Sequence, residues 1–439
     1  MGDFSNIIKK SLLFCIFGVL FLPLIQSTCK LVINAYPLEG DVILPNEVEC
    51  NKENWFSGQF QKEKEEYLNA MFGFRSLFVR LNNQIAYSVF NKANANGVII
   101  GKENYMYEIN YINGYTGADY LGNSEIDSVC NKLKFISDTL HKLNKELIVI
   151  FAAGKASFYP EFIPNQFLPK KGTSNYEALS EKINRLGICN IDFNKWFVQN
   201  KYKSKYPLYP QHGVHWSWYG ASLAADSLIN YIEYKRKIDI PNLKINSIEI
   251  DDAKYGDADI ANGMNLLFKF KSFKMAYPNL KTEDDSGKTK PSVLVISDSF
   301  YWTMYNLGIT NSFKNSHFWY YNKQVYPKTD NNEVLVSQLN LNDEIKNHDV
   351  FIIMASETSI KDIGWGAIKQ FNAFFKGQKN PLTTSQSPEY LSKRNEIISI
   401  IKTNTQWLAD AEKRAKDKGI SLDSSIVLEA MWQIEMSQR

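Results

Sequence analysis

Residues 293–300 are Val-Leu-Val-Ile-Ser-Asp-Ser-Phe. The apolar run at the start predicts a strand buried on both faces, and the polar Ser-Asp-Ser marks its carboxyl end. Open α/β sheets place their chemistry at this edge. We therefore expect Ser299 to present its hydroxyl at a functional site.

A serine hydroxyl is a weak nucleophile near neutral pH and needs a base, most often a histidine. The chain has 5 histidines, and His215 lies in the segment 213–220, Gly-Val-His-Trp-Ser-Trp-Tyr-Gly. Taken singly, a His-Trp pair or a strand ending in Ser-Asp-Ser is more often structural. Their joint presence predicts Ser299 as the nucleophile and His215 as the base.

Strands and helices alternate on both sides of this segment. The strands are expected at 147–151, 188–193, 292–296 and 349–354, with a helix from residue 124, a strand pair at 97–107 and helical segments around a Phe-Gly-Phe-Arg turn at 55–83. This alternation predicts an α/β fold with a doubly wound, mostly parallel sheet.

The composition is that of a folded, nearly neutral protein. The chain has 439 residues, 44% of them hydrophobic, with 50 Lys and Arg against 47 Asp and Glu. This length allows a large core and roughly two to three domains. The basic runs are brief, so we expect no nucleic-acid partner.

The amino terminus predicts a membrane segment. Lys9 and Lys10 precede an almost uninterrupted apolar run over residues 12–25. We interpret this run as an uncleaved anchor with its lysines in the cytoplasm, which puts the main domain on the extracytoplasmic, periplasmic side. A cleaved export signal and lipidation of Cys29 are the alternatives.

Four regions are expected from these patterns. They are a signal-anchor at residues 1–28, an amino-terminal cap of the core at 29–123, the α/β domain at 124–380 and a helical region at 389–439. The segment 377–388 has the composition of a linker between the last two.

Several short motifs resemble, in type and order, those of the alginate O-acetyltransferase group of SGNH-hydrolase-like proteins. Each motif is weak alone, and their order carries the resemblance. They are Trp-x-x-Gly-x-Phe at 55–60, Phe-Gly-x-Arg at 72–75, Gly-Lys-x-x-x-x-Tyr at 101–107, Lys-x-x-x-Tyr-Pro at 155–160, His-Trp-Ser-x-x-Gly at 215–220 and Asp-Ser-Phe at 298–300.

The resemblance implies an exported SGNH-type α/β domain that moves acetyl groups onto a polysaccharide, with a membrane-bound O-acyltransferase as the partner that supplies them. It implies that Ser299 carries the acetyl ester and that His215 moves the protons. The backbone N–H of Ser299 is the candidate oxyanion donor. No cofactor and no metal are expected.

One departure from the family pattern concerns the acid that orients the histidine. Members of this group often have Asp-x-His-Trp, whereas Gly213 stands two residues before His215. Asp192 and Glu357, which follow predicted strands, are equally ranked substitutes. A carboxylate against His215, on the ring edge away from Ser299, distinguishes an enzyme from an inactive descendant.

Four further residues are candidates for substrate binding. Arg75 offers a forked donor for a sugar carboxylate or acetyl oxygen, although a structural ion pair is the commoner role. Lys155 and Tyr159 follow the carboxyl end of a strand, where substrate contacts are expected. Trp216 adjoins the predicted base.

We therefore predict an anchored, extracytoplasmic O-acetyltransferase that acts on a surface or secreted polysaccharide. A carbohydrate acetylesterase is the first alternative, because water in place of a sugar hydroxyl requires the same serine and histidine. A catalytically inactive glycan-binding or scaffold protein of the envelope is the second, favoured by the missing acid at position 213.

Overall fold

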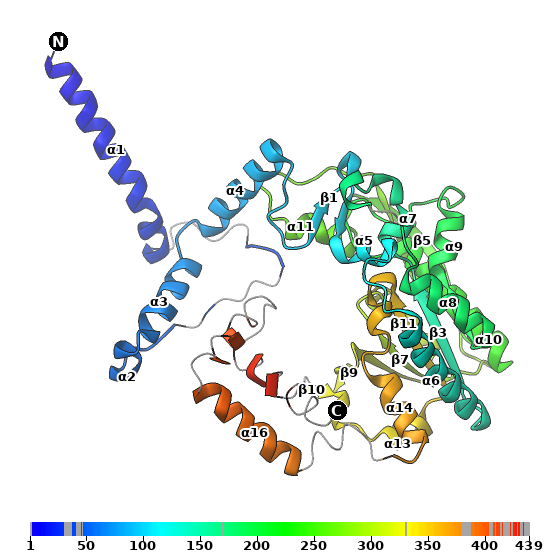
Figure 1. Ribbon diagram of the computed structural model, residues 1–439. Coiled ribbons are helices and arrows are strands. Elements are labelled where there is room, and N and C mark those ends of the chain that lie inside the picture. Colours follow the sequence, from blue (N-terminus) through cyan, green and yellow to red (C-terminus); the bar gives the residue numbers. More distant parts are fainter. Residues whose placement is uncertain are drawn as a thin grey trace. The chain divides into compact units, whose positions relative to one another are not determined.

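The computed structural model describes residues 2–29, 37–40, 45, 47–168, 171–329, 332–378 and 388–403, with scattered positions from 407 to 433 (Figure 1). The chain divides into two compact units. The first holds residues 1–96 and 261–270, and the second holds 97–260 and 271–439. Most of the predicted linker at 377–388 lies outside the described residues.

The first unit is helical. Its helices are α1 (Gly2–Cys29), α2 (Lys52–Phe56), α3 (Gln59–Ala70) and α4 (Arg75–Phe90). The span Asn6–Cys29 of α1 is long and apolar enough to cross a membrane. The turn before α4 contacts the end of α1, because Phe74 N donates to Gln26 Oε1 at 3.1 Å.

The second unit is built on a seven-stranded sheet in the order β10-β9-β8-β7-β11-β3-β4. Strands β8, β7, β11, β3 and β4 are parallel, and β9 and β10 extend the sheet as an antiparallel edge. The bounds are β3 Glu146–Ala152, β4 Asn190–Asp192, β7 Ser292–Ser297, β8 Asn315–Tyr320, β9 Gln324–Thr329, β10 Asn332–Leu335 and β11 Val350–Ser356.

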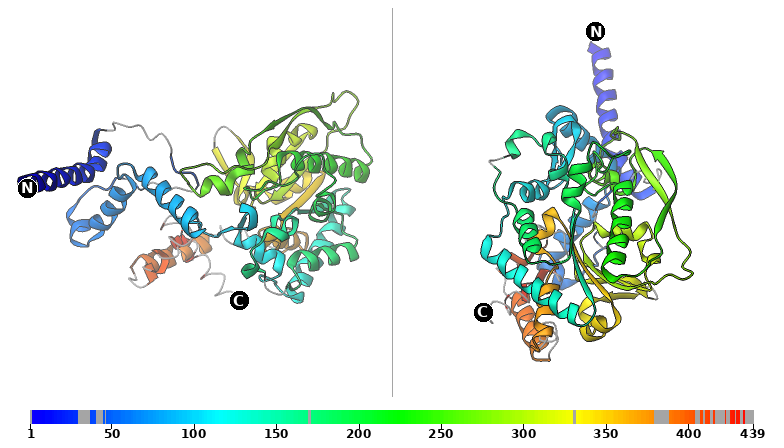
Figure 2. Two further views of the ribbon diagram at one scale, coloured as in Figure 1. Left: turned by 90° about the horizontal axis from the view of Figure 1, so that it is seen from above. Right: turned by 90° about the vertical axis from the view of Figure 1, so that its right-hand side faces the viewer.

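Helices cover both sides of this sheet (Figure 2). One face packs on α6 (Asn123–Lys142), α8 (Asn175–Arg185), α13 (Leu341–Asn347) and α14 (Ala367–Phe375). The residues of β7 and of β11 are all buried. A burial pattern without alternation is what a sheet covered on two faces requires. The expected doubly wound, mostly parallel fold is confirmed.

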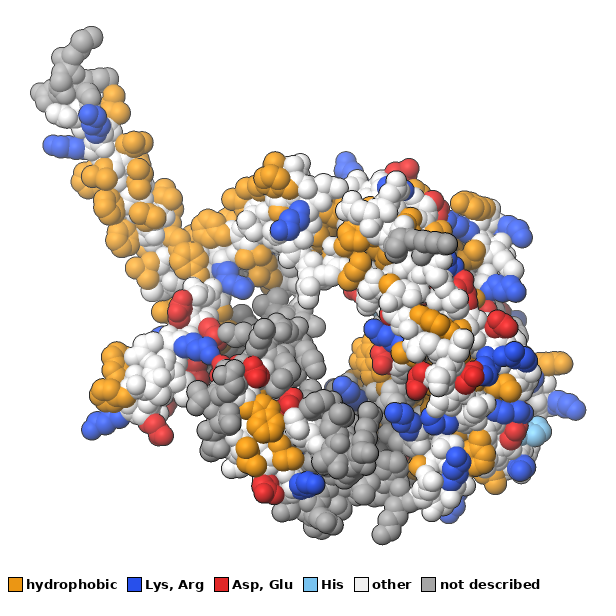
Figure 3. Space-filling model, in the orientation of Figure 1, with side chains coloured by type: hydrophobic (Ala, Val, Ile, Leu, Met, Phe, Trp, Pro, Cys, Tyr) orange, Lys and Arg blue, Asp and Glu red, His pale blue; other side chains and the backbone are white. Residues whose placement is uncertain are grey.

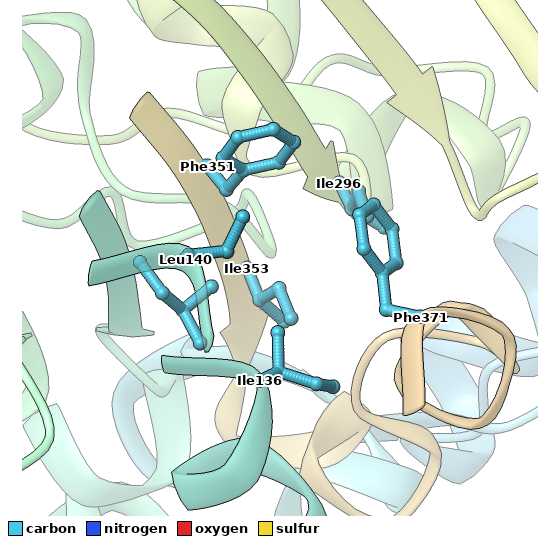
Figure 4. Close-up of a pocket in the computed structure, with 7 residues that line it drawn as sticks. Ile136, Leu140, Ile296, Phe351, Ile353 and Phe371 are labelled. Carbon is cyan, nitrogen blue, oxygen red and sulfur yellow. The ribbon is translucent and has the colours of Figure 1, made fainter. Parts of the chain in front are cut away.

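A small cavity lies between α6, α14 and the sheet (Figure 4). Its lining is wholly apolar: Ile136, Leu140, Leu147, Ile296, Phe351, Ile353 and Phe371. A space without polar groups offers nothing to orient a polar ligand, so we assign this cavity to core packing.

The remaining elements connect and border the sheet. They are β1 (Val98–Ile100) paired with β2 (Met106–Glu108), α5 (Ile109–Thr116), α7 (Lys155–Phe158), α9 (Phe193–Asn200), α10 (Trp218–Arg236), β5 (Leu243–Asp251) paired with β6 (Met275–Thr282), α11 (Asp259–Gly263), α12 (Tyr301–Asn306) and α16 (Pro388–Thr403).

Three of the predicted strands appear at their expected places as β3, β7 and β11. The strand expected at 188–193 is shorter, because the Asp192 carboxylate accepts from Lys195 N at 2.9 Å and caps α9. Strands β8, β9 and β10 were not predicted.

Candidate active site

Ser299 lies two residues beyond the carboxyl end of β7, in the turn that leads into α12. The neighbouring Asp298 is 1% exposed and fixes this turn. Its Oδ1 accepts from Phe300 N at 3.1 Å, and its Oδ2 accepts from Ser356 N at 2.8 Å, at the end of β11. Asp298 therefore has a structural role and holds Ser299 in place.

His215 lies in the loop between α9 and α10, and buried contacts fix that loop. Lys155 Nζ donates to the carbonyl oxygens of Gln211 at 2.8 Å and of Gly213 at 2.5 Å. The Tyr209 hydroxyl donates to Val214 O at 2.8 Å. A loop held at three of its carbonyls keeps the imidazole in one orientation.

The structure brings His215 and Ser299 together and adds a third group. His215 Nε2 is 2.8 Å from Ser299 Oγ, and His215 Nδ1 is 2.8 Å from Asp259 Oδ2. Because a carboxylate only accepts, we assign the imidazole proton to Nδ1, which leaves Nε2 to accept the serine proton. Ser299, His215 and Asp259 are thus joined by two successive hydrogen-bond contacts, the arrangement that a nucleophile, a base and an orienting acid require.

Asp259 is fixed at the first position of α11, in the connection between β5 and β6. Its Oδ1 accepts from Val214 N at 2.9 Å and from Ile260 N at 2.7 Å, which leaves Oδ2 for the histidine. The two backbone N–H groups hold this carboxylate against His215, although its side chain is 33% exposed.

Gly213, where the family pattern has an acid, is close to this connection. A Cβ at position 213 would overlap the carbonyl oxygen of Gly256 and the backbone of Asp257. The glycine therefore permits the approach of the segment that carries Asp259. The acid missing before the histidine is replaced by one from a distant part of the chain.

The charges around His215 raise its pKa. Burial lowers the pKa of His215, but the hydrogen bond and charge of Asp259, with the charges of Asp298 and Glu108, outweigh it, and the pKa lies above its usual value. The pKa of Lys155 is lowered by burial to about 7. Burial raises the pKa of Asp257 to about 7.

Tyr321, at the end of β8, is a further neighbour of the serine. Burial raises the pKa of its hydroxyl, while hydrogen bonds to the Ser299 side chain and backbone lower it. A phenol beside the nucleophile is placed to donate to charge that develops there. Nothing in the local sequence distinguishes this tyrosine among the 24 tyrosines of the chain.

Neither predicted acid lies against the histidine. Asp192 accepts from the Tyr176 hydroxyl at 2.9 Å and caps α9. Glu357 is 3% exposed and accepts from Ser157 Oγ at 2.7 Å. Both carboxylates are occupied locally, and Asp259 takes the position that either was expected to fill.

The predicted substrate contacts are mostly interior. Lys155 is 0% and Trp216 1% exposed, and the Tyr159 hydroxyl donates to Tyr209 O at 3.2 Å, so these three side chains support the histidine loop and its surroundings. Trp216 packs against Phe300, whose ring also lies 4.9 Å from that of His215. Arg75 begins α4 in the first unit.

One group among the described residues has donors for a metal ion, at the opposite edge of the sheet from Ser299. The ligand atoms of His317, Glu344 and His348 lie within 4.8 Å of one another. Glu344 Oε2 is 2.8 Å from His317 Nδ1, and His348 Nδ1 donates to Glu344 O at 2.9 Å. His348 Nε2 is buried without a hydrogen-bond partner in the described part of the chain, but the chemistry at Ser299 needs no metal.

The chain is similar to several solved structures, among them the following three. The O-acetyltransferase domain of Pseudomonas putida AlgJ is 13% identical, with 63% of this chain and 99% of that chain covered and a TM-score of 0.41. Pseudomonas aeruginosa AlgX is 14% identical (64% and 68%, TM-score 0.43), and Bacillus cereus PatB1 with a sulfonyl adduct is 13% identical (54% and 90%, TM-score 0.36). Among curated proteins, none matches the chain.

The sequence itself matches a family model. The ALGX model, described as an SGNH hydrolase-like domain, acetyltransferase AlgX, matches residues 98–284. This segment contains His215 and Asp259 and ends before Ser299. The match confirms the resemblance that the motifs indicate: residues 98–284 are similar to the SGNH hydrolase-like domain of acetyltransferase AlgX.

Proposed function

We propose that this protein is an extracytoplasmic O-acetyltransferase that carries an acetyl group on Ser299 and passes it to a hydroxyl of a polysaccharide. The observation that supports it is the line of Asp259, His215 and Ser299, with 2.8 Å at each of its two contacts. The family model that matches the surrounding domain is that of an acetyltransferase.

In the first half-reaction, Ser299 Oγ attacks the carbonyl carbon of an acetyl donor while His215 Nε2 takes the hydroxyl proton. The oxyanion of the tetrahedral intermediate is stabilised by the Ser299 backbone N–H and by the Tyr321 hydroxyl. When the intermediate collapses, the bond to the leaving group breaks, and His215 returns the proton to that group. An acetyl ester of Ser299 remains.

In the second half-reaction, a sugar hydroxyl attacks the ester carbonyl. His215 takes its proton, the same donors stabilise the new oxyanion, and the Ser299–acyl bond breaks with return of the proton to Oγ. Asp259 stabilises the imidazolium in both steps and keeps Nε2 directed at the serine. This orienting acid, the feature that separates an enzyme from an inactive descendant, supports catalysis.

The location and the partners belong to the same proposal. Helix α1 anchors the chain with Lys9 and Lys10 in the cytoplasm, and the second unit works on the outer side. A membrane-bound O-acyltransferase supplies the acetyl groups, and the acceptor is a polysaccharide. An impermeant maleimide added outside sealed spheroplasts tests the orientation. The maleimide should label the exposed Cys50, and the Cys50→Ser variant should show no label at residue 50. Labelling of Cys50 only after lysis would overturn the proposed orientation.

The chemistry is tested by mass spectrometry of the full chain after incubation with an activated acetyl ester. We expect an acetyl adduct on the peptide that contains Ser299, absent from Ser299→Ala and His215→Ala. Tyr202→Phe, a change at an exposed side chain, is the matched control and should keep the adduct. Folded protein that forms no adduct and turns over no ester would refute the proposal.

Acetyl transfer and ester hydrolysis are then separated by the acceptor. The acetylated protein is mixed with a soluble oligosaccharide, and the fate of the acetyl group is followed. Acetylated sugar supports the transferase. Release as free acetate at the same rate with and without sugar supports the esterase instead.

A further inference from the structure

Helix α4 turns polar side chains toward the rest of its unit. Asn83 Nδ2 donates to Met264 O at 2.9 Å, and Arg80 Nη1 donates to Leu266 O at 3.0 Å. Phe268 N donates to Gln84 Oε1 at 3.2 Å. These residues recur three and four positions apart, so they form one face of the helix. The segment 261–270 covers that face through backbone groups.

The apolar side chains of α4 point the other way. Leu77, Phe78, Leu81, Ile85 and Val89 also recur at three-and-four spacing, and each is between 43% and 66% exposed. We call them the α4 apolar face. A helix of a soluble domain buries its apolar side and exposes its polar side, so the arrangement here is inverted. Figure 3 shows hydrophobic side chains along α1 and α4.

The end of the apolar helix α1 sits at the start of α4. The apolar run of α1 ends at Ile25, and the next residue, Gln26, accepts from Phe74 N at 3.1 Å. A Cβ on Gly73 would overlap the Pro23 carbonyl oxygen, so the two segments are in close backbone contact. Where α1 leaves a bilayer, α4 begins.

We propose that α4 lies in the membrane interface, with the α4 apolar face in the boundary between lipid headgroups and acyl chains. The helix has 16 residues and none of them is acidic, so α4 carries no negative charge that an anionic phospholipid surface would repel. Its length, about 24 Å at 1.5 Å per residue, lets all five apolar side chains reach the same depth.

This inference rests on the proposed anchoring role of α1 and is independent of the chemistry at Ser299. It gives the chain two membrane elements, one that crosses the bilayer and one that lies on it. A single crossing helix leaves the attached unit free to swivel, whereas a helix lying in the surface restricts that rotation.

The test uses the full chain in vesicles of phosphatidylethanolamine and phosphatidylglycerol, with a single cysteine labelled by an environment-sensitive fluorophore. The positions are 15, which has a native cysteine in α1, Leu81→Cys and Ile85→Cys in α4, and Val198→Cys in α9, a 43% exposed apolar control in the second unit. A thermal melting curve like that of the parent shows that each variant is folded, whether or not the protein turns over an ester.

Lipids brominated on their acyl chains and aqueous iodide serve as the two quenchers. We expect bromolipids to quench positions 15, 81 and 85 and iodide to quench position 198. Quenching of positions 81 and 85 by iodide, as at position 198, would overturn the proposal. Bromolipid quenching at position 15 would still show that α1 is inserted. Protection of 81 and 85 from both quenchers would also overturn it, because a protein then covers the face. Absence of bromolipid quenching at position 15 would refute the proposed anchoring role of α1.

Discussion

Asp259→Asn changes one atom of the predicted triad, and the structure determines how the histidine responds. The Oδ1 oxygen is held by the N–H groups of Val214 and Ile260, so the asparagine keeps its oxygen there and turns its NH₂ toward His215 Nδ1. That nitrogen must then accept. The imidazole proton moves to Nε2, where it faces Ser299 Oγ, and the histidine no longer accepts the serine proton.

The size of the loss lies between two limits. Losing one hydrogen bond to a charged group costs about 1.5–3 kcal/mol, or roughly 10- to 100-fold in rate. Holding the wrong tautomer in a serine protease costs about 10⁴-fold. Since Asp259 is 33% exposed, water screens its charge and offers the ring other partners. We expect kcat to fall by about 10²- to 10³-fold, with KM little changed.

The assay is steady-state hydrolysis of p-nitrophenyl acetate by the full chain, with a melting curve for each variant. Asp192→Asn and Glu357→Gln are matched controls, because each neutralises a carboxylate that lies elsewhere in the second unit, and both should stay within about 3-fold of the parent. An Asp259→Asn enzyme within that range would refute the assignment. A large loss in either control with Asp259→Asn unaffected would move the role to that acid.

The site supports four other predictions. Adding Gly213→Asp to the Asp259→Asn variant should not restore turnover, because a Cβ at position 213 overlaps the adjacent backbone. Thermal unfolding should show that Gly213→Asp lowers the free energy of unfolding by about 1–3 kcal/mol. Regained turnover would contradict this prediction. The acid limb of the kcat/KM profile reports His215, whose pKa Asp259 raises, so in Asp259→Asn this limb should move to lower pH; a shift upward would be inconsistent. Burial lowers the pKa of Lys155 to about 7, below an unfolded value of about 10.4. Between these pH values the unfolded state binds more protons than the folded state, so Lys155 makes the free energy of unfolding increase with pH. Urea unfolding at pH 7 and pH 9 should show a smaller increase in Lys155→Met than in the parent. Tyr321→Phe should lower kcat by about 10-fold at unchanged KM if its hydroxyl donates to the oxyanion, and an unchanged kcat would exclude that role.

The central strands were predictable because burial on both faces leaves a continuous apolar run. The stretches 147–151 and 293–296 are of this kind, and each lies in a strand that has a neighbouring strand on both sides. Strand β8 (Asn-Ser-His-Phe-Trp-Tyr) mixes polar and aromatic residues, and β9 and β10 form the sheet edge. Edge strands bury less of their surface, so their sequences carry a weaker signal.

The contact between Ser299 and His215 was predictable because each residue stands in a short motif tied to local structure. The contact between Asp259 and His215 was not, because it joins segments 44 positions apart. Its own sequence, Asp-Ala-Asp at 257–259, offers two acids with no spacing that favours either. Packing decides between them: Asp257 is 0% exposed, whereas Asp259 begins α11 within reach of the ring.

The position of Asp259 in the chain affects which soluble fragment is suitable for enzyme assays. Two residues after it, at Ala261, the chain enters the first unit, where the segment 261–270 is held by α4. A soluble fragment that starts at Gly97 would contain every residue of the triad and yet leave this segment without its support. If that fragment is inactive, the cause is the missing support of segment 261–270 and not a defect of the triad. Enzyme activity should therefore be measured on a fragment that retains α4.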